Sequence, residues 1–309
     1  ISKLLLDKNN ISSEALHSGV FARYTELIEL NLDSNNITIL GEGTFQGLEH
    51  LTILRMYNNR ITLDMDFNNS TAFYPLNNTL ETLIINRNTN DRGRALLVYP
   101  DQALSVLSKL STLHIDGLNN SDFGIGFLNL RKLTKLLMAG YTDGFCNMYT
   151  ISGSMFVNLP YLKMLNISDC NIYGPRVNST AFSHLSRLQM LDVSNNFVLG
   201  IKAVETFMYG LKNNTNFVHL KMDRIVARFE PCVVIHKRTL TYFKYTGLQV
   251  IEARNNEIEM IEEGALEMLP STLKMVNLTN NRIMFGAYWK DMAFLTNLEG
   301  LYLDSSINL

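Results

Sequence analysis

The sequence predicts an α/β solenoid, in which stacked coils each add one short strand to a parallel sheet. Two interlocked patterns and the composition support this fold class. The pattern Leu-x-x-Leu-x-Leu-x-x-Asn-x-Ile recurs along the chain, with related apolar residues at the same places, and Phe-x-x-Leu-x-x-Leu leads into many of its copies. Hydrophobic residues make up 46% and charged residues 18% of the 309 residues. A chain of this composition buries a large core and is not disordered.

The first pattern divides the chain into coils. Residues 27–37 match it in full through Leu27, Leu30, Leu32, Asn35 and Ile37. Twelve copies begin at residues 1, 27, 51, 80, 110, 133, 162, 188, 217, 248, 273 and 298. Such a period indicates a repeat architecture, because one coil cannot bury its own apolar face and neighbouring coils share a continuous core.

The end of each strand is expected to carry a hydrogen-bonding ladder. Leu-x-Leu has the two-residue period of a strand, so the leucines point inward and the intervening residues point outward. The asparagine that follows offers both a donor and an acceptor to the backbone of neighbouring coils. Cys170 stands at this position as a small buried substitute. The predicted ladder comprises Asn9, Asn35, Asn59, Asn88, Cys170, Asn196, Asn256 and Asn281.

The second pattern fills the opposite side of each coil with aromatic and leucine side chains, beginning for example at Phe45, Phe127, Phe156 and Phe182. That side needs more room per coil than the strand does, so we expect the stack to curve. The predicted architecture is a horseshoe with the parallel β-sheet on its concave face, and with irregular loops and short helices on its convex face. Together the two patterns are those of the leucine-rich repeat.

Residues 1–309 are expected to form a single solenoid of about twelve repeats. Ile1 begins inside one copy, and Leu309 ends the chain shortly after another has begun. Solenoids need terminal caps with a polar outer face, and neither end carries a cysteine-rich cap. We therefore expect a fragment of a longer chain that lacks both caps.

Three cysteines are too few for a disulfide scaffold. Cys146 and Cys232 lie three copies apart, a separation of roughly 14 Å at the spacing of neighbouring strands. Disulfide-bonded Cα atoms lie within about 7 Å. These two cysteines are therefore not expected to pair with each other, and each either pairs outside this chain or stays free.

The chain is rich in Asn-x-Ser/Thr sequons, which favour passage through the secretory pathway. The alternative is a cytosolic repeat protein that is rich in asparagine. No apolar run approaches the ~20 residues of a membrane span. The predicted glycosylation sites are Asn10, Asn36, Asn68, Asn69, Asn77, Asn119, Asn166, Asn178, Asn213 and Asn277.

Catalysis has no support in the sequence. The six histidines form no His-Glu-x-x-His pattern, and no Cys-x-x-Cys, Gly-x-Ser-x-Gly or phosphate-binding glycine loop is present. We predict no catalytic residue, no cofactor and no metal site. The net charge of −2 also lacks the positive field that favours nucleic-acid binding.

Two candidate ligand-binding regions stand out. Ile53, Arg55 and Tyr57 occupy outward positions of one copy and combine aromatic, basic and apolar character, as binding hot spots do. His114 is also outward and is able to gain charge at endosomal pH. Lys237 and Arg238 lie in the basic loop 228–244, which suits an acidic ligand or a second ectodomain. Ordinary solvated side chains are the alternative for both regions. Further outward positions are Asp33, Asn86, Asp116, His219, Lys221, Asp223, Glu252 and Arg254.

The repeats resemble those of Toll and Toll-like receptor ectodomains. The resemblance is carried by "LIELNLDSNNITILGEGTFQGLEHLTILRMYNNRI" at residues 27–61, by "SMFVNLPYLKMLNISDCNI" and by "LKMVNLTNNRI", and it extends over the whole chain. It implies a pattern-recognition receptor that binds a protein or microbial ligand, forms a homo- or heterodimer and triggers innate-immune signalling. It also implies an extracellular or endosomal location, with a membrane-spanning helix and a cytoplasmic domain that are absent here. Secreted or cell-surface adhesion and matrix proteins use the same repeat and remain the alternative.

Overall fold

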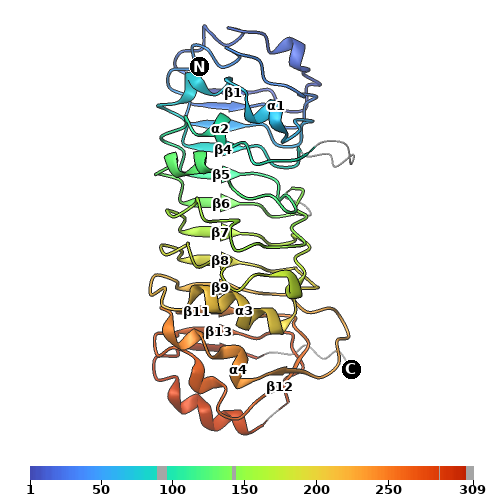
Figure 1. Cartoon of the computed structure of the whole chain (residues 1–309), viewed down its shortest axis with the longest axis vertical. Helices are drawn as coiled ribbons and strands as arrows, with labels where there is room; N and C mark the ends of the chain where they lie inside the picture. The colour runs from blue at the N-terminus through green and yellow to red at the C-terminus, as the bar shows by residue number, and fades with distance from the viewer. Residues whose placement is uncertain (89–95, 141–143, 285, 304–309) are drawn as a thin grey trace. The chain divides into compact units, whose positions relative to one another are not determined.

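The computed structural model describes residues 1–88, 96–140, 144–284 and 286–303. The chain forms two compact units. The first comprises residues 1–146 and 157–162, and the second comprises residues 147–156 and 163–309. Each unit is built from successive coils whose strands lie side by side in chain order (Figure 1).

Each predicted copy contains a three-residue strand that begins two residues after the copy does, and all these strands pair in parallel within their unit. The predicted α/β leucine-rich-repeat fold is thereby confirmed. The first unit holds β1 (Lys3–Leu5), β2 (Glu29–Asn31), β3 (Ile53–Arg55), β4 (Thr82–Ile84), β5 (Thr112–His114) and β6 (Lys135–Leu137). The second unit holds β7 (Met164–Asn166), β8 (Met190–Asp192), β9 (His219–Lys221), β11 (Val250–Glu252), β13 (Met275–Asn277) and β14 (Gly300–Tyr302).

The returning side of the coils carries short helices and one small extra sheet, in which β10 (Val233–Ile235) pairs in parallel with β12 (Ile258–Ile261). The α-helices are α1 (Met65–Asn68), α2 (Asp101–Leu104), α3 (Ile201–Leu211) and α4 (Lys237–Leu240). The 3-10 helices are η1 (Ser13–Ala15), η2 (Tyr74–Leu76), η3 (Ile125–Asn129), η4 (Gly174–Arg176), η5 (Phe243–Tyr245), η6 (Leu266–Met268) and η7 (Ala287–Phe294). Within the described residues, no helix combines the length and the apolar character needed to cross a membrane.

The core lies between the strand leucines and the rings of the second pattern. The central strand leucines, such as Leu30 and Leu191, are fully buried. Phe45 stacks on Phe73, and their ring centroids are 6.0 Å apart. In the long fourth copy Tyr99 supplies the ring, and its hydroxyl accepts a hydrogen bond of 2.9 Å from the backbone N–H of Leu118. Burial raises the pKa of Tyr99, so the phenol is neutral.

The ladder asparagines connect neighbouring coils through their side-chain amides. Asn196, which is fully buried, accepts hydrogen bonds from the backbone N–H groups of Cys170 (2.9 Å) and Ile172 (3.1 Å). Its Nδ2 donates to the carbonyl oxygens of Ile167 (3.0 Å) and Val193 (2.7 Å). Corresponding bonds are made by Asn35, Asn59, Asn88, Asn256 and Asn281, whereas Asn9, in the first copy, is exposed.

In nine copies the residue before the ladder position adopts a left-handed backbone conformation, a regularity that the repeat pattern did not predict. Examples are Asn195 (φ 60°) and Asn255 (φ 56°). Asparagine tolerates this conformation better than most residues, which explains the recurrent Asn-Asn pairs in the sequence. The other left-handed residues at this position are Lys8, Ser34, Asn58, Arg87, Asp169, Arg224 and Asn280.

Asp116 is not outward as predicted, because it replaces a missing ladder residue. Its copy has Leu118 at the ladder position, and the aliphatic side chain of Leu118 cannot accept a hydrogen bond from the backbone of the preceding copy. The fully buried Asp116 carboxylate accepts instead from the backbone N–H groups of Asn88 (2.9 Å) and Phe145 (3.1 Å). Asp33 and Asn86 are also buried, with exposed fractions of 7% and 6%, and so contribute less surface than predicted.

The cysteines correct a further expectation. Cys146 and Cys170 each belong to a disulfide, and Cys232 is free and exposed. Cys170 thus occupies its ladder position as an oxidised residue, and Cys146 is not free. The prediction considered only Cys146 and Cys232 for disulfide bonds and treated Cys170 as a small buried ladder residue.

Replacing Asn196 by alanine is expected to lower the free energy of unfolding by about 2 kcal/mol or more. The substitution leaves two buried N–H groups without their acceptor, and each such group costs about 1–3 kcal/mol. Chemical denaturation with the disulfide intact measures the change. The control is Asn129→Ala at an exposed asparagine, and an equal effect of the two substitutions would contradict the ladder's role.

Candidate ligand-binding surface

Parallel register arranges the outward side chains of the second unit in rows across the strands. One row is apolar except for His219, and the next is polar and charged. The first contains Met164, Met190, His219, Val250 and Met275, and the second contains Asn166, Asp192, Lys221, Glu252 and Asn277. The chain continues from the second row into a third set of polar residues two positions later, Ser168, Ser194, Asp223, Arg254 and Thr279.

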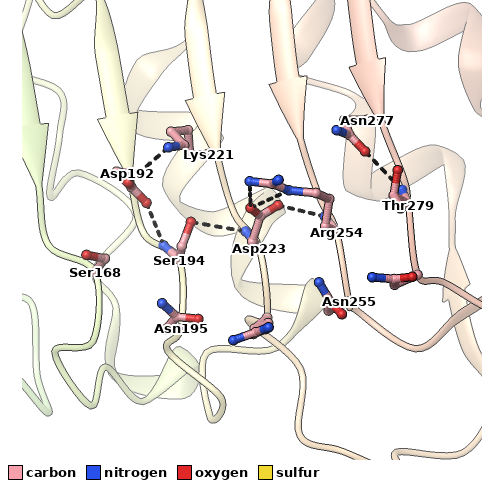
Figure 2. A pocket seen from close by; sticks show the side chains of 12 residues that line it. Ser168, Asp192, Ser194, Asn195, Lys221, Asp223, Arg254, Asn255, Asn277 and Thr279 are labelled. Carbon is pink, nitrogen blue, oxygen red and sulfur yellow. Dashed lines mark hydrogen bonds and ion pairs between the residues drawn. The ribbon is translucent and has the colours of Figure 1, made fainter. Parts of the chain in front are cut away.

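These second and third rows surround a depression of about 560 Å³, here called the polar pocket (Figure 2). Its lining contains no apolar side chain. It consists of Ser168, Asp192, Ser194, Asn195, Lys221, Asp223, Arg224, Arg254, Asn255, Asn277, Thr279 and Asn280. Four of these, Asn195, Arg224, Asn255 and Asn280, are left-handed residues that precede a ladder position. The same turn that builds the ladder therefore places side chains at the rim of the pocket.

Arg254 is held at the centre of the pocket by two carboxylates. Its Nε and Nη2 donate to Oδ2 of Asp223 at 2.9 and 2.7 Å, and Nη2 lies 3.0 Å from Oε2 of Glu252. The backbone N–H of Arg254 also donates to Oδ1 of Asp223 at 2.7 Å. The hydrogen bond that Arg254 donates to Asp223 raises the pKa of Arg254 above its ordinary value, so the guanidinium stays charged.

Lys221 and His219 extend this network along β9. The Lys221 Nζ lies 3.8 Å from Asp192 and 4.0 Å from Glu252. His219 Nε2 lies 2.8 Å from Oε1 of the same Glu252. Three carboxylates therefore share two permanent cations and one imidazole, and both charge signs face the pocket. This arrangement suits a ligand that offers hydrogen bonds and charges of both signs.

The candidate residues of the first unit lie next to one another, but most of their hydrogen-bonding groups already have partners within the chain. Arg55 donates through Nε and Nη2 to Oδ2 of Asp33 at 2.9 and 2.7 Å. Tyr57 donates its backbone N–H to the other oxygen of Asp33 at 2.7 Å, and its hydroxyl accepts from Arg87 at 2.9 Å. Ile53 is half-buried beside them. The sequence missed Arg87, whose guanidinium lies 5.8 Å from the centroid of the Tyr57 ring.

The remaining candidates lie elsewhere. His114 shares a row with Arg55, two strands away with Ile84 between them. Lys237 and Arg238 belong to the second unit, at the start of α4. Lys237 is already paired with Glu267, 3.8 Å away, and its backbone N–H donates to Glu262 at 2.7 Å. That hydrogen bond lowers the pKa of Glu262. The basic character of this loop is therefore partly neutralised.

The polar pocket was not among the predicted sites, although several of its residues were assigned to outward positions. Its signal in the sequence is the pair Lys221-x-Asp223 and Glu252-x-Arg254, which alternate in sign at equivalent positions of successive copies. Which charges pair depends on side-chain geometry across neighbouring copies, and the repeat pattern does not give that geometry. Among the described residues, no cluster of three metal-binding side chains is found.

The predicted glycosylation sites differ in how far their asparagine side chains are buried. Asn68 is only 4% exposed, and its Oδ1 accepts a hydrogen bond from the backbone N–H of Gln102, so the asparagine of this sequon is buried. The overlapping Asn69 is exposed. Asn277 lies in the polar pocket, and the side chains of Asn10 and Asn36 hydrogen-bond to each other. The other predicted sites, Asn77, Asn119, Asn166, Asn178 and Asn213, are exposed or half-buried.

Comparisons with known proteins agree with this architecture. A family model described as leucine rich repeat matches residues 1–61 and 145–198. The chain is 29% identical to Toll-like receptor 4 of Pinctada imbricata, over 84% of the chain and 28% of that protein. It is 25% identical to podocan of Mus musculus, over 92% of the chain and 44% of that protein. The chain thus spans less than half the length of these relatives.

A solved structure of the glycosylated Toll–Spatzle complex from Drosophila superposes with a TM-score of 0.63 at 15% identity, over 98% of the chain and 41% of that structure's chain. At this identity the likeness concerns the fold. The coils, the ladder and the matched segments define a leucine-rich-repeat fold. Within that class the chain resembles the ectodomains of Toll-like receptors, as its repeats predicted.

Replacing Asp223 by alanine is expected to lower the free energy of unfolding by about 1–2 kcal/mol. The larger part comes from the backbone N–H of Arg254, which loses its acceptor, because a half-exposed ion pair contributes little. Asp223→Asn keeps an oxygen for that N–H and should retain most of the stability in the same denaturation experiment. Equal losses for both variants would contradict this assignment.

Glycopeptide mass spectrometry of the secreted chain is expected to find a glycan on Asn178 and none on Asn68. The Oδ1 atom of Asn178 accepts from the N–H of Thr180 at 2.9 Å, and its side chain is exposed. A glycan on the buried Asn68 would displace its contact with Gln102. Full occupancy of Asn68 in the folded protein would refute the assigned burial.

Proposed function

We propose that this chain is the ligand-recognition part of a Toll-like receptor ectodomain. The observation that carries the proposal is the polar pocket, in which Arg254 and Lys221 are held on the outward face of the sheet by Asp223, Asp192 and Glu252. Because the ion pairs restrain these long side chains before a ligand arrives, binding loses little of their conformational entropy.

The ligand that we propose is a protein or another microbial molecule, not a nucleic acid. A nucleic acid presents a continuous row of negative phosphates and is bound by surfaces with an excess of Lys and Arg. The polar pocket instead presents carboxylates beside its cations, and the whole chain has a net charge of −2. A protein surface offers both charge signs and satisfies such a site more fully.

In the whole receptor we propose that ligand binding brings two ectodomains together as a homo- or heterodimer and starts innate-immune signalling. The membrane-spanning helix and the cytoplasmic signalling domain belong to a part of the receptor outside this sequence. The sequons support an extracellular or endosomal location. The role of the chain is binding, without catalysis and without a cofactor.

The second candidate is a secreted or cell-surface adhesion or matrix protein. The similarity to podocan favours it, because that match covers 92% of the chain. The two candidates differ in the part of the protein that lies beyond the repeats. Sequencing the transcript past Leu309 separates them, since a receptor requires one apolar helix of ~20 residues and a Toll-type cytoplasmic domain. A stop codon without a membrane segment would favour the second candidate.

In reporter cells that express the full-length receptor, Lys221→Glu is expected to abolish the response to heat-killed bacteria. The substitution adds a fourth carboxylate to those of Asp192, Asp223 and Glu252. Neighbouring like charges repel each other, so the arrangement of the pocket is lost. Lys163→Glu, at an exposed position of the same unit outside the pocket, is the matched control and should respond normally. An unchanged response of Lys221→Glu, with normal surface expression, would contradict recognition by the polar pocket.

A further inference from the structure

An apolar row of side chains lies directly beside the polar pocket on the outward face of the second unit. This row, here called the apolar row, runs in register across β7, β8, β9, β11 and β13 and contains Met164, Met190, His219, Val250 and Met275. All five side chains are half-buried, so part of each meets solvent. His219 is the polar member, and its Nε2 already lies 2.8 Å from Oε1 of Glu252. Apolar surface that is bordered by polar residues is typical of interaction sites.

Two charged residues of the polar pocket keep hydrogen-bonding capacity that the described part of the chain does not use. The Nζ of Lys221 lies 3.8 Å from Asp192 and 4.0 Å from Glu252, and both distances are too long for a hydrogen bond. Asp192 accepts from the backbone N–H of Ser194 through Oδ1, at 3.0 Å, and its Oδ2 makes only the long contact with Lys221. The ammonium group of Lys221 and Oδ2 of Asp192 are therefore able to bond to a ligand.

The spacing of the strands favours a helix over an extended segment as that ligand. Neighbouring strands lie about 4.8 Å apart, so the five strands from β7 to β13 span about 19 Å. In an α-helix that lies across them, residues i and i+3 are about 4.5 Å apart along the axis, which is close to the spacing of the strands. In an extended peptide, side chains on the same face are about 6.6 Å apart, so each successive contact drifts by about 2 Å.

We propose that the apolar row and the polar pocket together bind an amphipathic α-helix of a protein ligand, which lies across the strands of the second unit. Such helices bind through apolar side chains at positions i, i+3, i+4 and i+7, and this stripe covers the apolar row. Asp192 and Lys221 belong to neighbouring strands (Figure 2). A carboxylate at the edge of the stripe pairs with Lys221, and a basic side chain three positions away pairs with Asp192.

The apolar row and the mixed charges fit a helix better than other classes of ligand. Methionine side chains adapt to apolar partners of different shape, which suits the stripe of a helix. A polysaccharide offers hydroxyl groups to the polar pocket but no stripe of apolar side chains to Met164, Met190 and Met275. A nucleic acid brings its phosphates against Asp192 and Glu252. The proposal rests on the proposed function, because it names the ligand that the polar pocket recognises.

Two sequons lie at the ends of the proposed helix site. Asn166 and Asn277 belong to β7 and β13, on the same strands as Met164 and Met275. The sequence predicts glycans on both asparagines, and a glycan on either one would cover an end of the site. The proposal therefore requires both asparagines to be unmodified in the receptor that responds to bacteria. Glycopeptide mass spectrometry tests this, and a glycan on most chains at either asparagine would overturn the proposal.

The binding experiment uses the 309-residue chain secreted into the bacterial periplasm, which is oxidising and adds no N-glycan. A cooperative unfolding transition in denaturant first shows that the chain is folded. The probes are two helical peptides of about 15 residues with the same stripe of leucines. One carries lysine and, three positions later, glutamate on one edge of the stripe. The other carries glutamate and then lysine on the opposite edge, so the pair covers both directions in which a helix can lie.

Fluorescence anisotropy is expected to show that one of the two peptides binds with a Kd in the micromolar range. The same peptide with a central proline, which breaks the helix, should not bind. Lys221→Glu is expected to raise the Kd about tenfold or more. A peptide whose glutamate is replaced by lysine should recover this loss, which also shows that the variant is folded.

The contribution of the apolar row is measured with substitutions of Met190. Met190→Asp is expected to raise the Kd about tenfold or more, because it places a carboxylate under the stripe. Met190→Leu keeps an apolar side chain and should bind as the parent chain does. Lys163→Glu, at an exposed position outside the pocket, is the control for a change of charge alone.

Several results would overturn the proposal. These are a parent chain that binds neither peptide, equal binding of the peptide with proline, and a Kd that is unchanged in Lys221→Glu or in Met190→Asp. If neither peptide binds while Lys221→Glu abolishes the cellular response to heat-killed bacteria, the polar pocket remains the recognition site and the helical ligand is excluded. If a peptide binds while Lys221→Glu responds normally in cells, the surface binds helices and its role in recognition is overturned.

Discussion

The carboxamide of the ladder asparagine is the interaction on which the rest of the structure depends. Each strand of the repeats, from β1 to β14 without β10 and β12, is only three residues long, so the hydrogen bonds between neighbouring strands end after a few residues. The coil must then turn away from the sheet without leaving its backbone groups unsatisfied. The Asn196 side chain solves this by accepting from two N–H groups and donating to two carbonyls of its own coil and the preceding one. The leucine core provides the driving force, and the ladder determines how successive coils align.

The same turn determines what the outward face presents. Where the residue before the ladder position is left-handed, it lies at the end of the strand, and four such residues, Asn195, Arg224, Asn255 and Asn280, line the polar pocket. Strands in register then place Asp192, Lys221 and Glu252 in one row, close enough for ion pairs. The pocket thus forms because the coils are regular, whereas the charge of the residue at an equivalent position differs from one copy to the next. The long ninth copy differs from the others because it adds β10 and α4 to the other side of its coil.

The sequence predicted the strands well, because the two-residue period and the inward leucines leave one register that buries the apolar face. It predicted the chemistry of the surface less well. The two-residue alternation of the strand predicted that Asp116 points outward. Because Leu118 replaces the ladder asparagine of this copy, the backbone N–H of Asn88 lacks its usual acceptor, and the Asp116 carboxylate turns inward to accept from it. Arg55 and Tyr57 were recognised as neighbours, yet Asp33 already pairs with both. The pairing of charges depends on side-chain reach between residues about thirty positions apart, as with Asp223 and Arg254, and a repeat pattern contains no information on that reach.

Amide hydrogen exchange is the most direct test of whether the ladder holds the polar pocket in place. The N–H groups of Cys170 and Ile172 bond to Asn196 itself, whereas those of Ser194 and Asp223 bond to side chains of the pocket, Asp192 and Ser194. In Asn196→Ala we expect faster exchange at all four positions, while the strand amides of β13 and β14 keep their protection. Faster exchange at Cys170 and Ile172 alone would show that the pocket does not depend on the ladder, and unchanged exchange at all four would contradict the ladder's central role.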